Sequence, residues 1–64
     1  MATNLRMKAA RVLRGLTQLQ LADQVGRKEI EISRLETGRA QAEVELKQRI
    51  AAVLQKPTYE LFGY

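Results

Sequence analysis

Glycine and proline divide this chain into short segments, and their positions constrain the fold more than any other feature of the sequence. The four glycines and the single proline are Gly15, Gly26, Gly38, Pro57 and Gly63. Because both residue types interrupt regular structure, the segments between them are the units that can form helices or strands. Each segment has the length of a short helix, and none reads as a linker or a repeat. One domain over residues 1–64 is therefore expected.

Apolar spacing predicts two helices in the first half of the chain. Over residues 4–14 an apolar face lies beside a basic one, and it comprises Leu5, Ala9, Val12, Leu13 and Leu16. Thr17 and Gln20 have the spacing of a capping box, which begins a second helix over residues 18–25. The apolar face of that helix comprises Leu21, Ala22 and Val25. Gly26 ends it, because glycine accepts a positive φ.

Residues 27–38 pose an ambiguity, because polar and apolar side chains alternate from Lys28 to Ser33 as they do in a half-buried β-strand. A lone, charge-rich strand would be unstable, and the chain has no evident partner strand. A helix over residues 29–37 instead brings Ile32 and Leu35 onto one face. We therefore predict a helix here, with Gly38 as its C-cap.

Two further helices are predicted in the last third of the chain. Residues 43–54 place apolar side chains at helical spacing, namely Leu46, Ile50, Val53 and Leu54. A final short helix begins at Pro57 or Thr58, and Leu61 and Phe62 on it would close the core.

Composition excludes several classes of function. The chain has no cysteine and no histidine, which excludes disulfides, zinc fingers and catalysis through an imidazole or a thiolate. The carboxylates lack the clustering and the histidine partners of acid–base or metal catalysis, so we expect neither an enzyme nor a cofactor. No apolar run approaches the roughly 20 residues of a membrane span.

The charge is positive and unevenly distributed. A net charge of +4 and a pI near 10.0 suggest an anionic partner. The first 22 residues carry four bases and no acid, whereas residues 23–45 carry six acids and four bases. The acid-free start could be mistaken for a targeting peptide, but without it about 40 residues would remain, which is near the limit for folding alone. We therefore expect it to be part of the fold.

Two short helices joined by a glycine turn form a helix-turn-helix, whose second helix can enter the DNA major groove. At this point the sequence resembles the lambda-repressor-like or Cro-type (XRE) family of helix-turn-helix DNA-binding domains. The matching stretches are "GLTQLQLADQVG" (15–26), "ISRLETGR" (32–39), "IAAVL" and "ELF". The resemblance extends from about Leu5 to Phe62. It implies an all-α, compact five-helix domain in which the third helix is the recognition helix.

The resemblance also implies which residues contact DNA. Gln18 would bond a phosphate together with the free N–H groups at its helix start; the alternative is an ordinary solvated side chain. Lys28 or Arg34 would donate to guanine. Glu29 would accept from a cytosine amino group, and Ile30 would cover a thymine methyl. The complete expected set, in which Arg27 and Arg39 contact phosphates, is Gln18, Arg27, Lys28, Glu29, Ile30, Ser33, Arg34 and Arg39.

Some of these positions depart from the family pattern. Arg27 stands where the family commonly has an apolar residue, and Lys28 stands where it has a hydroxyl N-cap, so capping should be weaker. Glu29 and Glu31 place negative charge where phosphates approach, or else they complement the helix dipole. For Glu31 we favour the dipole role, and for Glu29 both remain open.

A second feature carried over from the family is an ion pair. An Arg late in the first helix pairs with the Glu that ends the third, and Arg11 and Glu36 match these positions. We expect a structural ion pair between the two helices, with two separate surface charges as the alternative.

The resemblance implies a homodimer on double-stranded DNA with a palindromic operator. The candidate interface is the C-terminal cluster of Tyr59, Leu61, Phe62 and Tyr64. Alternatively, Leu61 and Phe62 only close the core.

The function implied is sequence-specific regulation of transcription, by a repressor or a controller of its own operon. Such a protein would be cytoplasmic, nucleoid-associated and encoded by a bacterium or a phage. The alternative is an antitoxin-like or protein-interaction module with the same fold, in which DNA binding is secondary.

Overall fold

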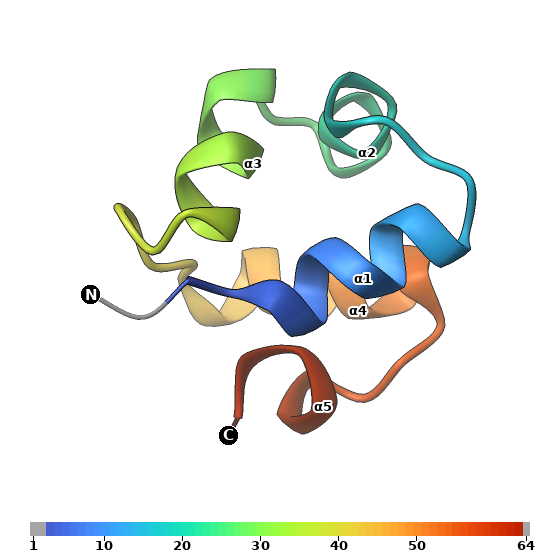
Figure 1. The fold of residues 1–64 in the computed structure, drawn as a ribbon, viewed down its shortest axis with the longest axis vertical. Coiled ribbons are helices and arrows are strands. Elements are labelled where there is room, and N and C mark those ends of the chain that lie inside the picture. The colour runs from blue at the N-terminus through green and yellow to red at the C-terminus, as the bar shows by residue number, and fades with distance from the viewer. Residues whose placement is uncertain (1–2, 64) are drawn as a thin grey trace.

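The computed structural model describes residues 3–63, and these fold into helices without a strand. The five helices are α1 (Leu5–Leu13), α2 (Gln18–Val25), α3 (Glu29–Glu36), α4 (Val44–Leu54) and α5 (Thr58–Phe62). Figure 1 shows α2 and α3 together at one side of the molecule and α5 at the opposite side. The all-α, five-helix architecture expected from the sequence is confirmed, and every helix begins within one residue of its predicted start.

Local capping explains why the first two helices begin and end where they do. The Asn4 side chain accepts a hydrogen bond from the Met7 N–H at 3.0 Å and caps α1. At α2, Thr17 accepts from the Gln20 N–H, and the Gln20 side chain accepts from the Thr17 N–H, which completes the predicted capping box. Gly26 ends α2 with φ 73°, a left-handed conformation that favours glycine.

The segment with alternating polarity is helical, as α3, and its end differs slightly from the prediction. The C-cap residue is Thr37 rather than Gly38, and Gly38 follows it with φ 78°. A glycine one position beyond the C-cap takes the left-handed conformation at which many helices end, so Gly38 performs the expected role one residue later.

The buried side of α1 is not the one that apolar spacing predicted. The residues of the predicted apolar face are exposed, namely Leu5, Ala9, Val12 and Leu13, and Leu16 beyond the helix is half-buried. The buried residues of α1 are Met7, Ala10 and Arg11. These also have helical spacing, and Arg11 faces inward because a buried carboxylate on α3 binds it.

One apolar core joins all five helices. It comprises Met7, Ala10, Leu21, Ala22, Val25, Ile32, Leu35, Leu46, Ile50, Ala51, Leu54 and Leu61. α2 contacts both α3 and α4, and α5 contacts both α1 and α4. The Asn4 N–H donates to the Glu36 carbonyl at 2.9 Å and ties the start of α1 to the end of α3. Within residues 3–63, no helix has the length and apolarity needed to cross a membrane.

Candidate nucleic-acid interface

The turn between α2 and α3 sets the direction in which α3 projects. The Arg27 N–H donates to the Ala22 carbonyl at 2.9 Å, so the chain closes the end of α2 before it turns. Ala22 and Ile32 are both fully buried in the common core. A small residue on α2 lets the two helices approach closely, which holds the other side of α3 toward solvent.

The outward side of α3 carries several of the predicted DNA-contacting residues. Ile30, Ser33 and Arg34 lie opposite the buried face of the helix, since Ile32 and Leu35 point into the core. The Ile30 side chain is 52% exposed. Lys28 and Glu29 are exposed at the start of the helix, and Lys28 caps it without a side-chain hydrogen bond, as expected from the missing hydroxyl. The structure therefore brings these five residues together on one surface.

The acids of α3 are mostly bound within the protein. Glu36 is buried and pairs with Arg11, and Glu31 pairs with Arg27 at 3.2 Å. Glu29 is the one acid of α3 without an ion pair in the described structure. The negative charge that would oppose a phosphate is thereby reduced to a single carboxylate.

Lys28, Arg34 and Arg39 are the cations available on this surface. All three are exposed, and none of them forms an ion pair with any of residues 3–63. Lys28 directly precedes α3, Arg34 lies on its outward side, and Arg39 follows its C-terminal end. Free cations in this arrangement can donate to phosphate oxygens or to base edges.

Arg27 differs from these three because its guanidinium is already held. It donates to Glu31 of α3 and to Glu43, the N-cap of α4. Hydrogen bonds to Glu31 and then Glu43 raise the pKa of Arg27 above its ordinary value. The predicted phosphate contact of Arg27 would have to use the remaining N–H groups of a guanidinium that two carboxylates already hold. In this geometry the residue braces the beginning of α3 against α4.

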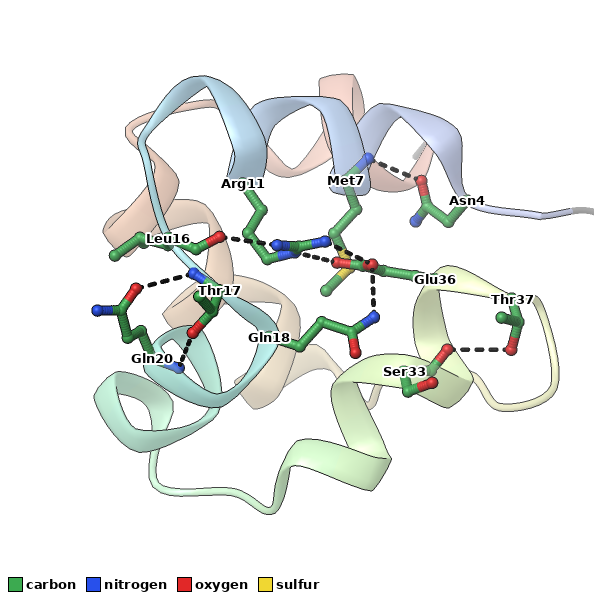
Figure 2. A network of polar contacts seen from close by, with 10 residues as sticks. All are labelled: Asn4, Met7, Arg11, Leu16, Thr17, Gln18, Gln20, Ser33, Glu36 and Thr37. Carbon is green, nitrogen blue, oxygen red and sulfur yellow. Dashed lines mark hydrogen bonds and ion pairs between the residues drawn. The ribbon is translucent and has the colours of Figure 1, made fainter.

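Gln18, the first residue of α2, is half-buried and turned toward α3. Its Nε2 donates to Glu36 Oε1 at 3.0 Å (Figure 2). One of the two N–H groups on this nitrogen is therefore committed within the protein. The first backbone N–H groups of a helix have no partner inside it and are available to a ligand. The structure therefore places the Gln18 side chain beside Glu36, the last residue of α3.

Arg11 and Glu36 lie together between α1 and α3, as Figure 2 shows. Arg11 Nε and Nη2 donate to the two Glu36 oxygens at 2.6 and 3.1 Å. Arg11 Nη1 donates to the Leu16 carbonyl at 2.7 Å. Both side chains are less than a tenth exposed, so this bidentate pair is buried and its polar atoms are satisfied. The pair fixes the end of α3 to α1.

Two residues near this surface were not identified from the sequence. Thr37 shares the outward side of α3, and its hydroxyl donates to the Ser33 carbonyl at 3.0 Å. Its spacing of four residues from Ser33 could have identified it. Arg49 of α4 donates to the Val25 carbonyl at 3.4 Å and so supports the end of α2. Nothing local in the sequence indicates that contact, because the two residues are distant along the chain.

The predicted C-terminal interface is only partly available. Leu61 is buried in the core, and Phe62 is half-buried with Lys47 Nζ 5.7 Å from its ring centroid. Tyr59 is 62% exposed. Tyr64 lies outside the described residues. Leu61 therefore closes the core, and among the three described members of this group Tyr59 is the one that faces solvent.

Comparison with known proteins gives one matching family and several similar solved structures, including the two that follow. The profile of the helix-turn-helix family matches residues 7–61. The chain is similar to the restriction-modification controller protein C.AhdI from Aeromonas hydrophila, with a TM-score of 0.85 and 25% identity, covering 92% of this chain and 89% of that one. It is also similar to Bacillus thuringiensis PlcR, solved with the peptide PapR7 and DNA, with a TM-score of 0.81 and 41% identity. That match covers 98% of this chain and 24% of PlcR. Among curated proteins, none matches the chain.

Proposed function

Because the chain belongs to the helix-turn-helix family, whose profile matches residues 7–61, we propose that it is a sequence-specific DNA-binding regulator of transcription. In this proposal α3 lies in the major groove of double-stranded DNA, and residues 1–64 act as one DNA-binding domain. The supporting observation is the charge arrangement of α3. Its acids Glu31 and Glu36 are bound internally, whereas Lys28 and Arg34 are free at its outer surface.

Each exposed residue of α3 has a chemical role in this proposal. Lys28 or Arg34 donates to guanine, and Glu29 accepts from the amino group of cytosine. Ile30 covers a thymine methyl, which gives its exposed side chain an apolar contact. Ser33 contacts a neighbouring base edge or backbone. These contacts would specify sequence.

Phosphate contacts would position the domain without selecting sequence. Arg39 beyond α3 and the N–H groups at the start of α2 supply them, and Gln18 joins them through the second N–H of its amide nitrogen while the first stays on Glu36. Arg27 contributes by holding α3 in place rather than by a free guanidinium.

The regulator would act as a homodimer on a palindromic operator, because one domain of this size offers a small contact surface for tight binding. The similarity to a restriction-modification controller protein favours a repressor or a controller of its own operon. We place such a regulator in the bacterial cytoplasm, encoded by the bacterium or a phage, and expect it to have no catalytic activity.

Selection from a pool of random DNA duplexes tests this proposal. We expect enrichment of a palindrome whose binding weakens about 10³-fold or more between 50 and 200 mM salt. Arg34→Ala should relax the preference at one base pair of each half-site, whereas Arg39→Ala should weaken all sequences alike. A pool that shows no enrichment even at low salt would contradict the proposal.

A further inference from the structure

The outward side of α1 carries an apolar surface that the described chain leaves uncovered. We name this surface the α1 stripe, and its members are Leu5, Ala9, Val12 and Leu13. They share one side of the helix because they follow Leu5 at intervals of about one and two turns. Leu5 is 65% exposed, Val12 57% and Leu13 83%. The side of α1 that carries leucine and valine therefore faces solvent, whereas the opposite side, with Met7, Ala10 and Arg11, is buried.

Positive charges border the α1 stripe. Arg6 and Lys8 flank it on its two sides by their positions on the helix. Both are exposed, and neither forms an ion pair within residues 3–63. The first turn of α1 contains no acid. In paired helices, a row of apolar side chains supplies the contact area, and the charged side chains beside that row determine which partner helix binds.

We infer that the α1 stripe docks an amphipathic helix of another protein, with Asp or Glu beside its apolar seam. Charge complementarity carries this choice of occupant. A second copy of this chain fits poorly, because two α1 stripes in contact would bring Arg6 and Lys8 of both copies together without an acid between them. An anionic membrane also fits less well, because the stripe has no aromatic side chain to anchor it at the lipid interface.

The position of the stripe leaves α3 accessible. Arg11 lies on the opposite side of α1 and binds Glu36 of α3, so the stripe faces away from α3. An acidic helix on the α1 stripe and DNA on α3 would therefore occupy different surfaces. The domain could hold a protein partner while it is bound to DNA.

A designed peptide pair tests the docking surface directly. The probe is a helical peptide of roughly 20 residues, with Leu along one seam and Glu beside it, and its counterpart carries Lys in place of Glu. Titration into the isotope-labelled full chain should shift the backbone amide NMR signals of α1. We expect the Glu peptide to bind at least about tenfold tighter than the Lys peptide at low salt, with the difference narrowing as salt rises.

Matched variants test the contributions of the α1 stripe and of the positive charges beside it separately. The double variant V12N/L13S should weaken the Glu peptide about tenfold or more, whereas Leu19→Ser removes an apolar side chain that is 51% exposed on α2 and should have no effect. The variant R6E/K8E should reverse the preference between the two peptides. All of these residues are exposed, and circular dichroism of each variant checks that the helices persist.

Several outcomes would overturn the inference. These are equal binding of both peptides, signal shifts outside α1, or full affinity in V12N/L13S. Binding to vesicles of phosphatidylcholine and phosphatidylserine without binding to the Glu peptide would assign the stripe to a membrane instead. Self-association that V12N/L13S abolishes would assign it to a second copy. Operator selection with V12N/L13S tests DNA binding separately, so the two proposals can fail independently.

Discussion

Arg11 and Glu36 are the pair of residues on which the arrangement of α1 and α3 most depends. Their side chains are buried, and the carboxylate also accepts from Gln18. If one partner were removed, the remaining charge would be buried without water to solvate it, which would destabilise the fold. The pair therefore matters more for the unique packing of the two helices than an ion pair of the same length at the surface.

We predict that Glu36→Gln destabilises the domain by about 3 kcal/mol or more, because it leaves the buried Arg11 charge unpaired. Urea unfolding measures the loss. Lys56→Ala is the control, since Lys56 and Glu60 are both about half exposed, and it should cost less than about 1 kcal/mol.

If Glu36→Gln does not fold, the double variant R11M/E36L provides the comparison. It removes both charges and should recover most of the lost stability. Equal unfolding free energies for Glu36→Gln and Lys56→Ala would contradict the buried role of the pair.

Arg27, whose guanidinium is bound by two carboxylates, can be compared with Arg39, which forms no ion pair within residues 3–63. Arg39→Ala should reduce the slope of log affinity against log salt by about 1, because one phosphate contact is lost. Arg27→Ala should leave that slope unchanged, because Glu31 and Glu43 hold its guanidinium. Salt titrations of operator binding measure both slopes. A reduced slope for Arg27→Ala would show that Arg27 also contacts a phosphate.

The capping of α2 links a local sequence signal to the proposed interface. Thr17 and Gln20 satisfy N–H groups at the start of α2, where Gln18 also lies. An ordered first turn keeps the remaining N–H groups of the helix directed outward. The same few residues thus serve stability and the placement of the proposed phosphate contact.

We predict that Thr17→Ala lowers the free energy of unfolding by about 1 kcal/mol, because it removes the hydroxyl that accepts from the Gln20 N–H. Thr17→Ser keeps the hydroxyl and should be nearly neutral. Thermal unfolding followed by circular dichroism compares the two variants. Equal losses for Ala and Ser would mean that the methyl group, and not the cap, stabilises α2.

The proposed DNA-contacting surface and the proposed docking surface lie on different helices of the domain. Lys28, Arg34 and Arg39 lie on or beside α3, the α1 stripe lies on α1, and the exposed Tyr59 lies on α5. Among the described residues of the C-terminal group predicted as a dimer interface, Tyr59 is the most exposed, because Leu61 belongs to the core and Phe62 is half-buried.

We predict that Tyr59→Ser weakens operator binding by roughly tenfold through loss of dimerisation, since buried aromatic side chains dominate many interfaces. Its unfolding free energy as a monomer should not change, because the side chain is 62% exposed. Tyr59→Phe retains the ring and serves as the control. Sedimentation equilibrium measures the dimer, and an unaffected dimer in Tyr59→Ser would place the interface elsewhere.

Much of the fold could be predicted because its signals are local. The capping box at Thr17, the left-handed Gly26 and the spacing of Ile32 and Leu35 each depend on neighbours within one or two turns. The alternation of polar and apolar side chains around Ile30 suggested a strand. The lack of a partner strand and the helical spacing of Ile32 and Leu35 favoured a helix instead. Periodicity assigned Ile32 and Leu35 to the core, whereas the candidate DNA-contacting residues of α3 came from the resemblance to the family.

The sequence by itself determined, to within about one residue, where the helices begin and end, and it determined which side of α2 and α3 is buried. Only the tertiary structure decided which side of α1 faces the core and which arginines are free. One side of α1 carries Met7, Ala10 and Arg11, and the other side carries the α1 stripe. The first side faces the core, where Arg11 pairs with Glu36, a residue that is distant along the chain. Arg27 likewise finds Glu43 only after α4 is placed. Long-range ion pairs leave no periodic signal, because their partners meet only when the helices pack.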